Sequence, residues 1–186
     1  MAMAGNELQD VVRVIDKDFV RYISSAKILQ RIKEMAGAMH NDLAGKNPVF
    51  LCVLNGAFFF AADLLKEIDF PCEISFVKVA SYSGMQSTGQ SKTLIGLDES
   101  LKGRHVVVLE DIVDTGFTML KLKEMMENTG VESFSIASLI LKPEALKHDI
   151  KLHYTGFEVP NDFLVGYGLD YNKQGRNYKH IYRLKN

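Results

Sequence analysis

The chain has 186 residues, of which 47% are hydrophobic and 24% charged, and its formal net charge is −1. This length suits one domain better than two small ones, and the charge excludes a globally basic protein that binds nucleic acid through bulk charge. Cys52 and Cys72 form no CxxC pair, so we expect no zinc site, no disulfide framework and a cytoplasmic location. Neither a signal peptide nor a membrane-spanning run is visible, and we expect no membrane association.

The hydrophobic pattern predicts alternating strands and helices. Apolar residues at helical spacing predict a helix that begins near Ser24 or Ser25 and runs to Leu43, and continuous apolar runs predict buried strands. A stretch rich in Ser, Gly and Gln predicts a mobile loop at 81–92. The other expected elements are strands at 49–54, 74–80, 93–97, 106–109 and 134–141, helices at 57–68 and 117–128, a polar turn at 110–116, and short strands at 163–166 and 181–184.

This order of elements favours an α/β fold, a mostly parallel twisted sheet with helices on both faces. In such sheets the ligand lies beyond the carboxyl ends of the strands, where turns lead into helix N-termini. The informative turns are therefore 54–56, 110–118 and the segment after Leu141.

The segment 106–118 carries the strongest functional signal. Three carboxylates follow an apolar strand, namely Glu110, Asp111 and Asp114. A helix N-terminus follows them, and its free amides and dipole suit a phosphate. Thr115 and Thr118 can add hydroxyl donors, Gly116 allows close approach, and the acids can accept hydrogen bonds from sugar hydroxyls. The alternative is a solvated acidic turn that caps the helix. The chain contains neither GxxxxGK[ST] nor GxGxxG.

Residues 107–118 resemble the phosphoribosyl pyrophosphate loop of type I phosphoribosyltransferases. Other segments, in the same order along the chain, resemble the hypoxanthine-guanine branch of that family, so the resemblance covers about 49–176. They are the pyrophosphate loop at 53–58, the flexible catalytic loop at 81–89, the strand with a purine-contacting lysine at 139–142, and the hood at 156–160 and 163–172 with Arg176 after it.

The resemblance implies the type I phosphoribosyltransferase fold in a single domain over 1–186, with a small hood formed mainly by about 156–186 and possibly the N-terminal segment. It implies purine salvage: the phosphoribosyl group of phosphoribosyl pyrophosphate passes to hypoxanthine or guanine, giving IMP or GMP and pyrophosphate. Magnesium (Mg2+) is the implied cofactor, and a homodimer or homotetramer is the implied assembly, with no nucleic-acid partner.

The resemblance also assigns roles, each to a residue in a matched segment. Catalysis falls to Asp114 as general base and to Lys142 as donor to the purine 6-oxo group. The implied substrate-binding residues are Glu110, Asp111, Thr115, Gly116, Phe117, Thr118, Leu54, Asn55, Gly56, Ser81, Tyr82, Phe163, Leu164 and Arg176, and the implied metal ligands are Asp170, Glu110 and Asp111. A cis peptide is expected at Leu54-Asn55.

Simpler interpretations and rival functions stay open at this level. Taken alone, Lys142 before Pro143 could be an exposed lysine that closes an edge strand, and Phe163 could belong to the core. Asn55 stands where a basic residue is usual in the family. The rivals are a nucleotide-sensing regulator that binds nucleic acid, which the net charge disfavours, and an enzyme for xanthine, adenine or a pyrimidine. Xanthine is the hardest of these to exclude.

Overall fold

The computed structural model describes residues 10–79, 93–95 (backbone only) and 101–185. Its main layer is a six-stranded sheet with the strand order β5-β4-β3-β6-β7-β8. The pairs β4·β3, β3·β6, β6·β7 and β7·β8 are parallel, and β5 is antiparallel to β4. The strands are β3 (Val49–Val53), β4 (Glu73–Val79), β5 (Thr93–Ile95), β6 (His105–Val113), β7 (Ser133–Leu141) and β8 (Tyr154–Glu158).

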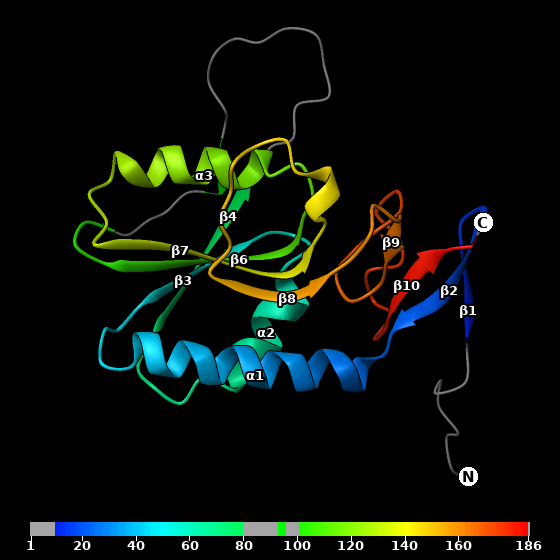
Figure 1. Cartoon of the computed structure of the whole chain (residues 1–186), viewed down its shortest axis with the longest axis horizontal. Helices are drawn as coiled ribbons and strands as arrows, with labels where there is room; N and C mark the ends of the chain where they lie inside the picture. Colours follow the sequence, from blue (N-terminus) through cyan, green and yellow to red (C-terminus); the bar gives the residue numbers. More distant parts are fainter. Residues whose placement is uncertain (1–9, 80–92, 96–100, 186) are drawn as a thin grey trace, which may run out of the picture.

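Helices cover both faces of this sheet (Figure 1). Helices α1 (Ser25–Leu43) and α2 (Phe58–Lys66) lie on one face, and α3 (Phe117–Glu127) lies on the other. A 3-10 turn, η1 (Pro143–Ala145), follows β7. The cap of α1 is Ser24, whose side chain accepts a hydrogen bond from the amide of Lys27 at 3.3 Å. None of the helices in the described part of the chain combines the length and apolar character needed to cross a membrane.

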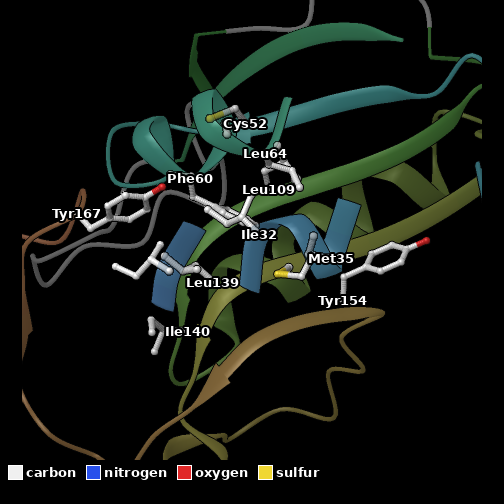
Figure 2. Packing of buried hydrophobic residues seen from close by; sticks show 14 of the residues in the cluster. Ile32, Met35, Cys52, Phe60, Leu64, Leu109, Leu139, Ile140, Tyr154 and Tyr167 are labelled. Carbon is white, nitrogen blue, oxygen red and sulfur yellow. The ribbon is translucent and has the colours of Figure 1, made fainter. Parts of the chain in front are cut away.

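Alternate side chains of the central strand β3 serve the two layers. Phe50 and Cys52 pack with α1 and α2, whereas Leu51 and Val53 pack with α3. All five residues of β3 are buried, so the strand contributes to two apolar cores at once. Figure 2 shows the core on the α1 side, where Tyr167 and Tyr154 bound the cluster.

A second, antiparallel sheet stands beside the main one and has the order β1-β2-β10-β9. Its strands are β1 (Val11–Val14), β2 (Lys17–Ile23), β9 (Leu164–Val165) and β10 (Ile181–Leu184). It joins segments from both ends of the described chain, since Ile181 pairs with Ile23. We call these four strands, with residues 159–180, the hood; in Figure 1 it lies on the right, beyond the ends of the main strands.

The edge strand β8 is bound to α1 by a charged side chain. The guanidinium of Arg31 donates from Nε to the carbonyl of Gly156 at 2.9 Å and from Nη2 to that of Thr155 at 2.8 Å. The phenol of Tyr154, in the same strand, donates to Asp42 at 2.9 Å. The edge strand is therefore fixed to the helical layer through both main-chain and side-chain contacts.

The predicted α/β architecture with helices on both faces is confirmed, and most element positions agree within two residues. One element was wrong: residues 110–113 are not a polar turn, because β6 continues through Val113. The sequence pattern did not predict β1, β2 or β8. Residues 156–158, expected in the hood, pair with β7 in the main sheet. The loop predicted at 81–92 lies outside the described residues.

Candidate active site

The end of β6 carries a buried pair of carboxylates. Glu110 and Asp111 expose only 7% and 8% of their surface. Burial raises the pKa of Glu110, and the charge of Asp111 raises it further. Burial also raises the pKa of Asp111, while the nearby Arg176 opposes that rise. Carboxylates with so little water favour a ligand that supplies hydroxyl donors or positive charge.

Three segments meet tightly at this pair. A Cβ on Gly56 would lie 1.8 Å from Oδ2 of Asp111, and a Cβ on Gly168 would lie 2.0 Å from the carbonyl oxygen of Gly56. The loop after β3, which holds these backbone atoms, contains the expected cis peptide at Leu54-Asn55. Glycine at both positions thus lets the end of β6, the loop after β3 and the hood come into direct contact.

The loop between β6 and α3 forms a small cradle. Gly116 adopts a left-handed φ of 79° directly before the first residue of α3, Phe117. Thr115 Oγ1 accepts from the amide of Phe117 at 3.4 Å, and Asp114 accepts from the amide of Thr115. A cleft of about 20 Å³ is lined by Glu110, Ile112, Val113, Asp114, Gly116, Phe117, Thr118 and Met119. The cradle combines hydroxyl groups with a helix N-terminus, which is the arrangement that binds phosphates.

Lys142 lies at the end of β7, and its backbone joins it to the cradle. Its amide donates to the carbonyl of Val113 at 2.9 Å, which places it beside Asp114. The residue is only 9% exposed. Burial lowers the pKa of Lys142, and the charges of Asp114 and Asp162 oppose that fall. The simple interpretation of an exposed lysine on an edge strand is wrong, because β7 lies between β6 and β8.

The hood presents an aromatic face next to this lysine. Phe163 remains 45% exposed, although its ring meets Tyr171 edge-on at 5.7 Å and Phe19 at 6.2 Å. It is therefore a supported ring with a free face, which a core residue would not have. Leu164, in β9, is buried and can offer only its main chain to a ligand.

Asp170 and Arg176 form an ion pair in the hood. Arg176 also donates to the carbonyl of Gly168, and Asp170 accepts from the amide of Lys173 at 2.6 Å. In the described residues, no three acidic, histidine or cysteine side chains converge as a ready metal cluster. Magnesium does not need such a cluster, because it keeps several waters and binds one or two carboxylates together with substrate phosphates. The acidic oxygens here fit that pattern.

The structure thus gathers the expected residues at the carboxyl edge of the main sheet and in the adjoining hood. Ser81 and Tyr82 lie outside the described residues, so their expected part stays a prediction. Sequence reasoning missed Gly168 and Asp162. For Gly168, the only signal in the sequence was its closeness to another glycine at 166. For Asp162, no local sequence feature indicated a role.

Comparison with known proteins identifies the family. The family model for the phosphoribosyl transferase domain matches residues 22–172, and the chain belongs to this family. Hypoxanthine-guanine phosphoribosyltransferase of Streptococcus thermophilus (strain CNRZ 1066) is 41% identical over 174 residues, which cover 92% of this chain and 97% of that protein. Within the family, the chain therefore groups with the hypoxanthine-guanine phosphoribosyltransferases.

Solved structures agree with this grouping. A hypoxanthine phosphoribosyltransferase from Staphylococcus aureus has a TM-score of 0.86 at 33% identity and covers 99% of this chain and 97% of its own. A hypoxanthine-guanine phosphoribosyltransferase from Bacillus anthracis has a TM-score of 0.82 at 34% identity and covers 89% and 96%.

Proposed function

We propose that this protein catalyses purine salvage, transferring the phosphoribosyl group of phosphoribosyl pyrophosphate to hypoxanthine or guanine and releasing IMP or GMP and pyrophosphate. The observation that carries this proposal is the buried ammonium of Lys142 beside Asp114, at a site that also has a phosphate cradle. A donor that cannot accept selects a purine with a carbonyl at the 6-position.

The main-sheet side of the site binds the sugar phosphate. Glu110 and Asp111 accept hydrogen bonds from the two ribose hydroxyls, which relieves their poor solvation. The cradle of Thr115, Gly116 and Thr118, with the Phe117 main chain, receives the 5′-phosphate. The main chain at 54–56 and the guanidinium of Arg176 receive the pyrophosphate. Because Asn55 carries no charge, Arg176 is the side-chain cation that we assign to this group.

The hood side of the site binds the purine. Phe163 stacks on the ring with its free face, Lys142 donates to the 6-oxo group, and the main chain near Leu164 accepts from a guanine 2-amino group. Asp114 takes the proton of the purine imidazole as its nitrogen attacks the anomeric carbon and pyrophosphate leaves. The Asp114 carboxylate also accepts a hydrogen bond from the amide of Thr115, and this bond orients it for the proton transfer.

Magnesium belongs to the same proposal. Glu110 and Asp111 at the ribose and Asp170 at the pyrophosphate are the residues that would hold it. When bound, the ion neutralises charge that develops on the leaving pyrophosphate. To hold the ion, Asp170 would have to release its ion pair with Arg176, which would leave the Arg176 guanidinium free for the pyrophosphate.

We also propose a homodimer or homotetramer that works in the cytoplasm. Side chains of α2 and β4 line an apolar groove of about 310 Å³, and four large ones are exposed there or beside it: Phe58, Phe59, Ile74 and Phe76. Such a patch on a small domain supports association. Both cysteines are free, as a reducing compartment requires. Light scattering on the purified protein tests the assembly.

A purine panel with phosphoribosyl pyrophosphate and magnesium, read by pyrophosphate release, tests the activity. Hypoxanthine and guanine should react, and adenine should be slower by about 10⁴–10⁵-fold in kcat/KM. Xanthine is the informative extra arm, because it shares the 6-oxo group and differs at the 2-position. Rapid turnover of adenine, or no release with any 6-oxopurine, contradicts the proposal.

A further inference from the structure

Backbone hydrogen bonds of Lys142 and of its neighbour Leu141 join the end of β7 to two turns, and only the first of these turns belongs to the phosphate cradle. On one side its amide donates to Val113, next to Asp114, at 2.9 Å. On the other side β8 runs parallel to β7, with Glu158 opposite Leu141, and the amide of Val159 donates to the carbonyl of Leu141 at 2.9 Å. The turn that follows, 160–162, therefore lies beside Lys142.

This second turn carries a carboxylate that has no assigned role. The amide of Asp162 donates to the carbonyl of Pro160 at 2.7 Å and closes the turn. Its side chain is 29% exposed and pairs with Nη1 of Arg183 at 3.3 Å. Arg183 in turn lies over the ring of Tyr22 at 5.0 Å. The carboxylate is thus held from the hood sheet, through a guanidinium on β10 that packs against β2.

From this bracketing we infer that Asp162 is a positioning residue for purine selection: it keeps the buried Lys142 ammonium charged, so that the site reads a 6-oxo acceptor and rejects a 6-amino donor. The inference rests on the proposed function, since it assumes that Lys142 contacts the purine. It adds a second carboxylate to the one that serves as general base, and it gives the hood sheet a part in selectivity.

The electrostatic reason follows from the groups that surround Lys142. Burial favours the neutral amine, while Asp114 and Asp162 favour the ammonium. Glu144 and Glu158 are also near in the fold, but both are exposed and screened by solvent. Asp114 is an uncertain support during reaction, because it takes up the purine proton and loses its charge. Asp162 takes no part in that proton transfer, so its support of the ammonium does not depend on the catalytic carboxylate.

The balance between burial and the two carboxylates fixes the direction in which the pKa of Lys142 should change. Removing the Asp162 charge removes a contribution that raises the pKa of Lys142, so that pKa falls and the neutral amine appears at lower pH. A neutral amine has a lone pair and can accept from the adenine amino group. Loss of Asp162 should therefore weaken hypoxanthine use and help adenine, and both changes should grow as the pH rises.

The test compares Asp162→Asn with the parent between pH 7 and pH 9.5. The ratio of the two kcat/KM values for hypoxanthine cancels the ionisation of the substrates. It should stay within about twofold at the low end and fall by about 3- to 10-fold at the high end, where each unit of pKa counts tenfold. Glu144→Gln, which removes an exposed carboxylate two residues from Lys142, is the matched control and should leave the ratio flat. Asp162→Glu, which keeps the charge, should restore most of the parent profile.

A direct titration separates this inference from the proposed function. Lysines labelled at Cε are followed by NMR against pH in the parent and in Asp162→Asn, with Lys142→Arg to assign the signal. The Lys142 midpoint should move to lower pH in the variant, whether or not the protein turns over hypoxanthine. An unchanged midpoint overturns the inference even if the enzyme is active. Should Asp162→Asn fail to fold, as judged by its melting curve, Asp162→Ser takes its place in the same titration.

Discussion

The two halves of the candidate site are built in opposite ways. Most of the sugar-phosphate half, namely the ribose carboxylates and the phosphate cradle, comes from one continuous segment, in which β6, a short loop and the start of α3 follow each other within residues 105–118. The purine half is assembled from distant parts of the chain: β2 pairs with β10, and β10 pairs with β9. Local sequence therefore determines most of the first half, whereas long-range pairing determines the second.

This difference indicates which substitutions should affect the reaction and which should affect the stability of the fold. A change in the sugar-phosphate half should act on chemistry and leave the fold intact, because the surrounding strands are buried on both sides. A change in the hood should act on stability first, because its strands are short and because its residues Leu164 and Tyr167 belong to the core that α1 and α2 form with the main sheet. The predictions below run from the largest expected effect to the smallest.

Asp114→Asn should lower kcat by about 10²–10⁴-fold, because the amide cannot take the purine proton. Binding of phosphoribosyl pyrophosphate, measured by calorimetry, should change little, and the melting temperature should be kept. Asp149→Asn, an exposed site in the neighbouring loop, is the control. Near-normal turnover of Asp114→Asn would remove this residue from the mechanism.

Lys142→Gln should narrow the preference for hypoxanthine over adenine by about 10- to 150-fold, which corresponds to the free energy of a hydrogen bond to a charged group. The reason is that an amide can present a donor or an acceptor to the 6-position. The measurement is kcat/KM for both purines, with the exposed Lys151→Gln as control. If the variant discriminates as sharply as the parent, another group reads the 6-position.

Gly168→Ala tests the junction between the halves. The new Cβ would lie 2.0 Å from the Gly56 carbonyl oxygen at a φ of +99°, so we expect the free energy of unfolding to fall by about 2–4 kcal/mol. Gly37→Ala, in α1, has no atom within 4 Å of the added Cβ and should stabilise by about 0.5–1 kcal/mol. Urea denaturation of both variants gives the comparison, and equal effects would mean that the junction is not tight.

Tyr167→Phe should cost about 1–2 kcal/mol of unfolding free energy while turnover is largely retained. The phenol donates to Asp63 at 2.6 Å and joins the hood to α2. Asp63 keeps its ion pair with Lys66, at 2.9 Å, so the variant does not leave the Asp63 charge without a partner. The control is Tyr178→Phe, because the Tyr178 side chain makes a ring contact with Tyr182 and its hydroxyl makes no hydrogen bond within the described residues. A loss of activity larger than the loss of stability would show that Tyr167 has a more direct role.

The sequence was sufficient for the regions whose pattern is local. The apolar stripe of α1 and the buried run of β3 predicted their elements closely. The extension of β6 through Val113 was not predictable in this way, since two acids interrupt the apolar run at the point where the strand continues. Only the neighbouring strand β7, with Ser138 opposite Glu110, explains why the backbone stays extended.

The hood strands and their contacts could be identified only from the structure. The strands β1 and β2 have mixed polarity, and the partner of Ile23 is Ile181, so no local pattern could reveal the pairing. The burial of Lys142 depends on β8, which the sequence did not predict. The ion pair of Asp162 with Arg183 depends both on the pairing of β2 with β10 and on β8. Side chains whose environment comes from distant strands were thus identified as candidates only through family resemblance, or were missed.

The guanidinium of Arg31 has a consequence for the behaviour of the protein at high concentration. A parallel sheet that ends in a free strand offers a row of unpaired main-chain groups, and another chain can extend it into an aggregate. Here the carbonyls of Thr155 and Gly156 in β8 are already occupied by Arg31. An incoming strand would have to displace and desolvate a charged group. The last strand of the main sheet is thereby protected against edge-to-edge addition, and growth of the sheet by β8 is disfavoured even when the chain is crowded.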